Sequence, residues 1–214
     1  MTWTLNLMSV GPMPPHWHLV DIAFARQFGC AHDVGFVGTK QTVRRFAARY
    51  RLARSFECLK FKAGHDYGEE TATGYERIFR VFLCWSAFEL LTKITGTRRD
   101  PAAIEAFAIS VGSEAAASAI YGVPDHTAYL DAVLEKVTTR GLKLALQDFM
   151  ARVPNRVMAV PESIRHIFAH GELTPNAGRA VEACSNICEI STDLMFRIMD
   201  KMVEDRFRRM RLIT

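Results

Sequence analysis

A short stretch in the last quarter of the chain, RHIFAHG, holds the residues best suited to chemistry. It places Arg165, His166 and His170 within six residues, directly ahead of Gly171. A histidine that titrates near neutral pH can move a proton, which accelerates a reaction by about 10² to 10⁴. An arginine can hold phosphate oxygens and stabilise the charge that develops on them. Together these groups suit the attack of a ribose 2′-hydroxyl on its own phosphodiester, a reaction that requires no metal.

Helical spacing decides how the three groups can meet. His166 and His170 are four residues apart and share a helix face, whereas Arg165 lies about 140° from His170 on a regular helix. The helix is expected to run from about Glu162 to His170, because Gly171 suits the left-handed position that follows a C-terminus. The three side chains can therefore line one groove only if that groove is wide or a second subunit closes it.

A second helix is expected close behind the motif. Thr174 and Pro175 are typical of an N-cap and first-turn pair, so a long helix is predicted from Pro175 to about Met210. Its first turn would offer unpaired backbone N–H groups beside His170, where a phosphate could bind. Thr174 and Asn176 are therefore candidate binding residues.

Each motif residue also has a plainer interpretation. Arg165 could pair with Glu89 or Glu162 and simply hold the helix ends together. His170 could lie at a helix C-terminus because its cation suits the helix dipole, an effect of about 0.3 to 1 kcal/mol. His166 could be a packing residue with a satisfied ring nitrogen.

The five cysteines are an odd number at scattered spacing, which indicates reduced thiols rather than a disulfide framework. Cys184 and Cys188 share a helix face and are interpreted as small buried residues. They matter for a zinc alternative, because His166 and His170 could hold a metal only if these cysteines faced the same site. No metal or cofactor is expected.

Helical signals dominate the rest of the chain, and the expected fold class is all-α. The 214 residues, 49% of them hydrophobic, can bury a substantial core. A central helix is predicted over residues 68–96, with acids at its start, Lys93 near its end and Gly96 after its last turn. Its middle is apolar almost all round. Shorter helices are expected from Asp100–Pro101 to about Val111, over residues 113–122, from Asp125 to about Thr139 and, after a break at Gly141, over residues 142–153, with Pro154 and Pro161 bracketing a loop.

The start of the chain differs from the rest. Residues 1–39 are interpreted as an irregular N-terminal segment, extended near residues 2–10 and with a short helix over HLVDIAFARQF; residues 40–214 form the helical domain. No apolar run approaches the roughly 18 residues of a membrane span, and the N-terminus does not read as a signal peptide. A cytoplasmic protein without a membrane partner is expected.

Positive charge is unevenly distributed. The net charge is +4, yet Lys40–Lys62 holds eight Lys or Arg against one Glu, and residues 206–211 hold four arginines. The spacing of apolar residues from position 41 predicts a long basic amphipathic helix there. Such clusters can attract phosphates, which makes Arg44 and Arg45 candidate RNA-binding residues. The solvated face of any bundle helix can have the same composition.

The stretch RHIFAH resembles the R-x4-6-H motif of the HEPN superfamily, in which a polar residue often follows the arginine and a glycine the histidine. Residues 75–91, YERIFRVFLCWSAFELL, are similar to the long core helix of that family, where an acid often faces the motif; Glu89 is the candidate here. His166 departs from the asparagine that is commoner in the family and leaves two candidate proton carriers. Residues 101–153 look like an insertion into a minimal HEPN-like bundle.

The resemblance implies an antiparallel helical bundle, a homodimer that brings two motifs together and, in many members, metal-independent RNase activity in toxin–antitoxin or antiviral defence systems. Two hypotheses follow. The chain is an endoribonuclease that binds RNA, uses Arg165, His170, His166 and Glu89, and has an antitoxin or another protein as partner. Alternatively, it is a non-catalytic HEPN-like module that binds a nucleotide or RNA or assembles with proteins.

Overall fold

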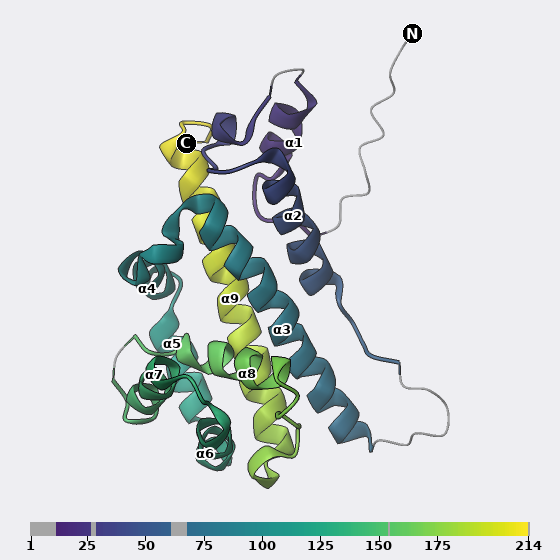
Figure 1. Cartoon of the computed structure of the whole chain (residues 1–214), viewed down its shortest axis with the longest axis vertical. Helices are drawn as coiled ribbons and strands as arrows, with labels where there is room; N and C mark the ends of the chain where they lie inside the picture. Colours follow the sequence, from purple (N-terminus) through teal and green to yellow (C-terminus); the bar gives the residue numbers. More distant parts are fainter. Residues whose placement is uncertain (1–11, 27–28, 61–67, 154, 214) are drawn as a thin grey trace.

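The computed structural model describes residues 12–26, 29–60, 68–153 and 155–213, and these fold into helices joined by short connections (Figure 1). Within this part of the chain there are no strands, so the expected all-α class is confirmed. The extended stretch expected over residues 2–10 lies outside it. The α-helices are α1 (His18–Ala25), α2 (Lys40–Ser55), α3 (Glu69–Thr95), α4 (Pro101–Ser110), α5 (Ser113–Tyr121), α6 (His126–Lys136), α7 (Arg140–Met150), α8 (Ala159–Ala169) and α9 (Val181–Arg209), with 3-10 turns η1 (Ala31–Val34), η2 (Thr97–Arg99) and η3 (Ala177–Arg179).

Helix α3 is the axis of the bundle, and α2, α8 and α9 pack against it (Figure 1). Its bounds follow the predicted signals: Glu69 and Glu70 lie in the first turn, Lys93 lies in the last, and Gly96 ends it with a φ of 78°. Acids at the start and a base at the end both suit the helix dipole. Because α3 is buried along most of its length, it fixes where its neighbours can lie.

The α3–α9 contact forms the centre of the core. Ile78, Val81 and Leu91 of α3 are completely buried, as are Leu194 and Met199 of α9. Burying a side chain of this kind contributes about 1.5 to 3 kcal/mol relative to leaving it exposed. The described part of the N-terminal segment joins the same core through aromatic contacts, because the Trp17 ring centroid lies 5.4 Å from that of Phe46 and 5.9 Å from that of Phe36.

A polar cluster joins α2 to α9 beside this core. The Tyr50 hydroxyl donates to Asp200 Oδ1 at 2.5 Å, and Arg54 donates to Asp200 Oδ2 at 2.9 Å. The Arg54 guanidinium also lies 4.0 Å from the centroid of the Phe196 ring. Burial raises the pKa of the Asp200 carboxyl, and its two hydrogen-bond donors oppose that shift. The cluster therefore ties the basic helix to the bundle through charge-assisted hydrogen bonds.

The last turn of α3 is tied to the end of α9. Arg206 donates from its guanidinium to the carbonyl oxygen of Thr95, one of the α3 carbonyls that has no partner within the helix. The neighbouring Phe207 is fully buried and packs edge-on against Phe36. Residues near the C-terminus thus complete a helix that begins more than a hundred positions earlier in the sequence.

Several predicted boundaries are wrong. The basic helix stops at Ser55 instead of continuing toward Lys62, and beyond it the Leu59 N–H donates to Glu76 of α3. Gly141 does not break a helix, because it lies in the first turn of α7; the break falls at Val137, which is buried with an extended backbone.

The loop expected up to Pro161 is also shorter than predicted. Helix α8 begins at Ala159 and contains Pro161 in its first turn. Proline is tolerated there because the first N–H groups of a helix have no intrahelical partner. By contrast, the start at Asp100–Pro101 is confirmed, since the Asp100 carboxylate accepts from the N–H of Ala103 at 3.0 Å.

The lengths and compositions of the helices show whether any of them could span a membrane. Among the described residues, no single helix is long and apolar enough to cross a membrane, although α4 and α5 pass that test when taken together as a pair bent by 78°.

Candidate functional site

The motif lies on α8, whose end has the predicted geometry. The N–H of Gly171 donates to the carbonyl of Phe168, and the N–H of Glu172 donates to the carbonyl of Ile167. With Gly171 at a φ of 73°, these two bonds form a Schellman motif. Because Ile164 and Ile167 are buried against the bundle, the other faces of α8 present the motif outward.

Arg165 reaches across to α3. Its guanidinium lies 3.4 Å from Glu89 Oε1, and the two side chains are 34% and 49% exposed. An ion pair this open to water contributes at most about 1 kcal/mol to stability. The pair orients the guanidinium without burying it, so Arg165 remains accessible to a second anion.

The two histidines form a contacting pair. Their ring centroids are 4.8 Å apart with the ring planes at 67°, and Thr138 Oγ1 lies 3.4 Å from His166 Nε2. Burial lowers the pKa of His166, and the charges of His170 and Arg165 lower it further, while Glu172 acts in the opposite direction. His166 is therefore neutral near pH 7 and can accept a proton.

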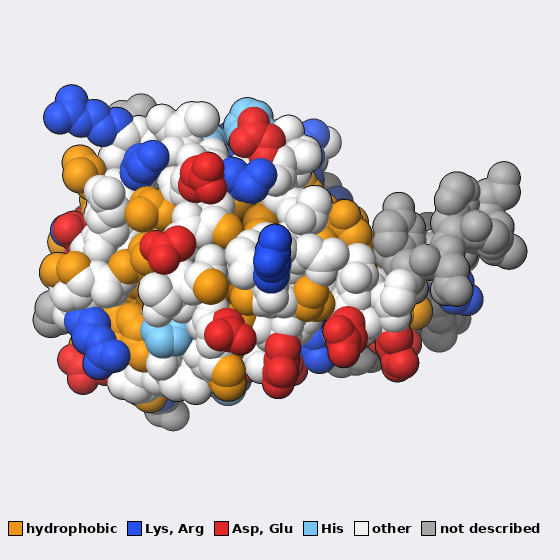
Figure 2. Space-filling model, turned by 90° about the horizontal axis from the view of Figure 1, so that it is seen from below, with side chains coloured by type: hydrophobic (Ala, Val, Ile, Leu, Met, Phe, Trp, Pro, Cys, Tyr) orange, Lys and Arg blue, Asp and Glu red, His pale blue; other side chains and the backbone are white. Residues whose placement is uncertain are grey.

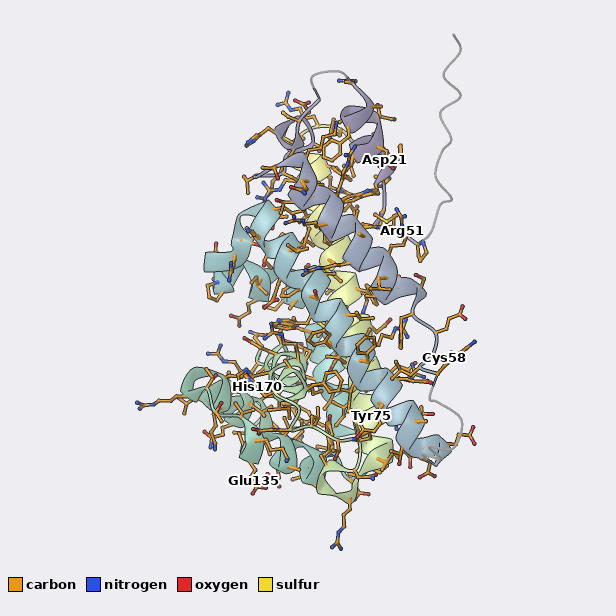
Figure 3. The ribbon with its side chains drawn as sticks, turned by 45° about the vertical axis from the view of Figure 1, so that its right-hand side comes forward. Asp21, Arg51, Cys58, Tyr75, Glu135 and His170 are labelled. Carbon is orange, nitrogen blue, oxygen red and sulfur yellow. The ribbon has the colours of Figure 1, made fainter. Side chains whose placement is uncertain are left out.

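A cavity of about 270 Å³ opens beside this pair, between α3, α7 and α8. Arg165 and His166 both line it, together with Glu89, whereas His170 does not line it and contacts the ring of His166. Figure 3 places His170 at the end of α8, in the half of the bundle away from Asp21 of α1. The cavity is lined by Trp85, Glu89, Thr139, Gly141, Leu142, Ala145, Glu162, Arg165 and His166.

The sequence favoured His170 as the principal proton carrier, with His166 assisting. In the structure, His166 lines the cavity beside Arg165. His170 is not a lining residue, and its ring contacts the ring of His166. The spacing of the motif could not distinguish them, because both lie on one helix face.

A second cavity of about 350 Å³ continues from the first along α3. The two share four lining residues: Trp85, Glu89, Ala145 and Glu162. Burial raises the pKa of the Glu162 carboxyl; Arg165 opposes that shift, and the nearby Glu89 carboxylate reinforces it. Sequence reasoning missed this cavity because its walls come from elements far apart in the chain.

The predicted phosphate site behind the motif is wrong in its geometry. Helix α9 starts at Val181, not Pro175, and residues 177–179 form only a short 3-10 turn. Thr174 and Asn176 are both exposed, and each uses its carbonyl oxygen to accept an N–H of that turn. Gly178 interrupts the helix with a φ of 65°, and a Cβ there would lie 2.3 Å from the Ala128 carbonyl of α6. Contact with α6 therefore decides where α9 begins.

The basic residues of α2 contact different parts of the bundle. Arg44 and Arg45 are exposed, and the Arg44 guanidinium lies 5.9 Å from the centroid of the Phe24 ring in α1, the end of the bundle away from α8 (Figure 1). Arg49, not singled out from the sequence, donates to Ser86 Oγ at 2.8 Å. Ser86 lies one turn before Glu89 on α3, so Arg49 contacts α3 close to the residue that Arg165 contacts.

The buried thiols of Cys184 and Cys188 lie against the hydroxyl of Tyr129, away from the histidine pair. Burial raises the pKa of both Tyr129 and Cys188. The zinc alternative required these cysteines to face the histidines, which they do not. In the part of the chain that the structure describes, no group of three His, Cys, Asp or Glu is arranged to hold a metal ion.

The lower end of the bundle, near α6 and the start of α9, carries a mixed surface. Figure 2 shows red and blue side chains scattered among orange ones on this face, without a single extended basic patch among the described residues drawn there.

Comparison of the chain with protein-family models, with curated proteins and with solved structures finds no match. What can be said of function therefore rests on the residues of this chain and on how the bundle places them.

Proposed function

We propose that this protein is a metal-independent endoribonuclease whose active site is formed by Arg165, His166 and His170. The observation that supports this best is the shared cavity: a guanidinium and a pKa-lowered imidazole line it together, and a second imidazole touches the first. The resemblance to HEPN proteins supports the same reaction and suggests a role in a toxin–antitoxin or antiviral defence system.

Two imidazoles and one guanidinium supply what the reaction needs. Neutral His166 removes the proton of the ribose 2′-hydroxyl, and the 2′-oxygen then attacks the adjacent phosphorus. Arg165 holds the phosphoryl oxygens while negative charge builds on them. The 5′-oxygen leaves with a proton from protonated His170, which yields a 2′,3′-cyclic phosphate and a 5′-hydroxyl.

The close contact of the rings suits this division of labour. Two adjacent imidazoles disfavour each other's charged forms, so two protons on the pair are strongly disfavoured. When the pair holds a single proton, it contains one base and one acid. Glu89 acts as a positioning residue, because its carboxylate contacts the guanidinium of Arg165. A second copy of the chain, which the resemblance suggests as a partner, would close the open side of the cavity.

A second candidate function is favoured by the ion pair itself. If Arg165 serves only to hold α8 against α3 through Glu89, the chain is a non-catalytic HEPN-like module for nucleotide, RNA or protein binding. In that case the histidines order the junction after α8.

Labelled RNAs of mixed sequence, incubated with the protein and EDTA, distinguish the two. We expect cleavage with cyclic phosphate ends, a loss of about 10² to 10⁴ in rate for His166→Ala and for His170→Ala, and about 10² to 10³ for Arg165→Ala. His32→Ala, which removes an exposed histidine of η1, is the matched control and should retain full rate. Unchanged cleavage in the motif variants would refute the assignment, and no cleavage of any RNA would favour the binding module.

A further inference from the structure

The second cavity has the composition of a recognition pocket. An apolar floor is formed by Trp85, Phe88 and Met158, and its volume of about 350 Å³ falls within the range of small-molecule sites. It adjoins the cavity of the motif, because Trp85 and Ala145 line both. A flat apolar group could therefore occupy it while a phosphate attached to that group lies beside Arg165.

Three of the side-chain acceptors that line this cavity, from Glu105, Asn155 and Glu162, have no ion pair or hydrogen bond among the described residues. Glu162 forms no ion pair within 4.0 Å among the described residues, and the same holds for Glu105. Asn155 Oδ1 is buried and accepts no hydrogen bond within the described part of the chain. Because an ionised carboxylate can only accept, a ligand suited to this pocket must bring several N–H donors.

The charges around the two cavities balance. The lining includes three carboxylates, from Glu89, Glu105 and Glu162, and three guanidiniums, from Arg98, Arg156 and Arg165. A ligand with a net positive charge would gain little electrostatic energy from this balanced lining. A neutral group attached to an anion suits the lining better, because the anion can lie beside Arg165. Single-stranded RNA presents such groups, since unstacked bases are commonly held on aromatic side chains and read along their Watson–Crick edges.

We propose that this pocket binds a guanine base of the RNA substrate, with its Watson–Crick edge on the Glu162 carboxylate, so that cleavage occurs next to guanosine. The proposal rests on the proposed nuclease function and adds its base preference. Guanine presents N1–H and N2–H as neighbouring donors, which match the two oxygens of one carboxylate. Adenine and cytosine each offer a single amino group on that edge, and uracil offers one ring N–H.

The pKa of Glu162 is relevant to when the pocket can work. Burial raises the pKa of the Glu162 carboxyl. Once the carboxyl is protonated, one of its two oxygens carries the proton, and the group can no longer accept from both N–H donors of guanine. Guanine binding should therefore weaken as the pH falls through the raised pKa of Glu162.

Equilibrium binding of the four nucleoside 3′-monophosphates, measured by calorimetry in EDTA, tests the pocket without requiring cleavage. We expect guanosine 3′-monophosphate to bind at least tenfold more tightly than the other three, and Glu162→Gln to remove that preference. Ala145→Phe, which places a ring in the passage shared by both cavities, should abolish nucleotide binding. Glu135→Gln is the matched control, because this exposed acid of α6 lines neither cavity. Melting curves confirm that each variant is folded.

The outcomes separate this proposal from the nuclease assignment. Selective guanosine binding without any RNA cleavage would support the pocket and count against the nuclease. Cleavage at all four bases, with Glu162→Gln unchanged in cleavage pattern, would support the nuclease and overturn the pocket. Equal binding of the four nucleotides, or binding of spermidine in their place, would also overturn it.

Discussion

Replacing Gly74 by alanine tests how closely the loop behind the motif packs on α3. A Cβ at position 74 would lie 2.4 Å from Cβ of Pro175 and 3.0 Å from its Cγ. Pro175 cannot rotate out of the way because its side chain is closed onto the backbone. The loop would have to retreat by about 1 Å to restore an ordinary carbon–carbon distance of about 3.5 Å.

The expected loss of stability follows from two opposing effects. Forcing an extra methyl into a packed contact costs about 1 to 3 kcal/mol, and exchanging glycine for alanine within a helix returns about 1 kcal/mol. The net decrease in the free energy of unfolding is therefore about 0 to 2 kcal/mol. For a chain of this size, each kcal/mol shifts the melting temperature by about 2 to 4 °C, so Tm should fall by up to about 8 °C.

Gly141→Ala is the control for this measurement. It lies in the first turn of α7, and a Cβ there would meet no heavy atom within 4 Å. Alanine should raise the stability by about 0.5 kcal/mol, which corresponds to about 1 to 2 °C. Thermal unfolding followed by far-UV circular dichroism measures both variants. A melting temperature for Gly74→Ala above that of the unmodified chain would show that the loop does not pack as described.

Three further predictions concern charged groups. Asp200→Ala should lower the free energy of unfolding in urea by about 1 to 3 kcal/mol, because a buried hydroxyl and a guanidinium of α2 lose their acceptor; Asp193→Ala, which removes only an exposed i,i+4 pair, should change it by less than about 0.5 kcal/mol. The pKa of His166, followed by NMR titration, should fall in Glu172→Gln and rise in Arg165→Met, since Glu172 raises it and Arg165 lowers it; shifts in the reverse directions would contradict the described arrangement. Because the folded pKa of His166 lies below its ordinary value of 6.5, the unfolded chain binds that proton more readily, and stability should decrease as the pH falls below about 6.5. His166→Gln should flatten that part of the stability profile, and an unchanged profile would refute the linkage.

Local signals in the sequence were enough to predict much of the fold. The dipole-matched ends of α3, the Asp100–Pro101 start and the left-handed Gly171 all depend on backbone chemistry within one or two turns, and the structure confirms each. The errors arise where contacts distant in sequence decide the outcome. Gly178 ends a would-be helix because it packs on α6, and no local pattern reports that contact.

The sequence predicted the residues of the candidate site better than it predicted their arrangement. The motif pointed to Arg165, His166 and His170, but periodicity alone gave no reason to prefer one histidine. Which imidazole lines the cavity depends on α7, whose packing against α8 could not be derived from the sequence. Arg49 could have been noticed from the length of the basic helix, since it lies farther along α2 than Arg44 and Arg45, toward the middle of α3.

The hydrogen bond from Arg206 to the Thr95 carbonyl makes the geometry of the motif depend on residues far from it in the sequence. Glu89 lies fewer than two turns before Thr95, so fraying of the end of α3 would release the carboxylate that orients Arg165. Deleting the segment from Arg206 onward would therefore remove the constraint that keeps Glu89 in place to orient Arg165. A fusion partner is better attached after these last residues, through a spacer, than in place of them.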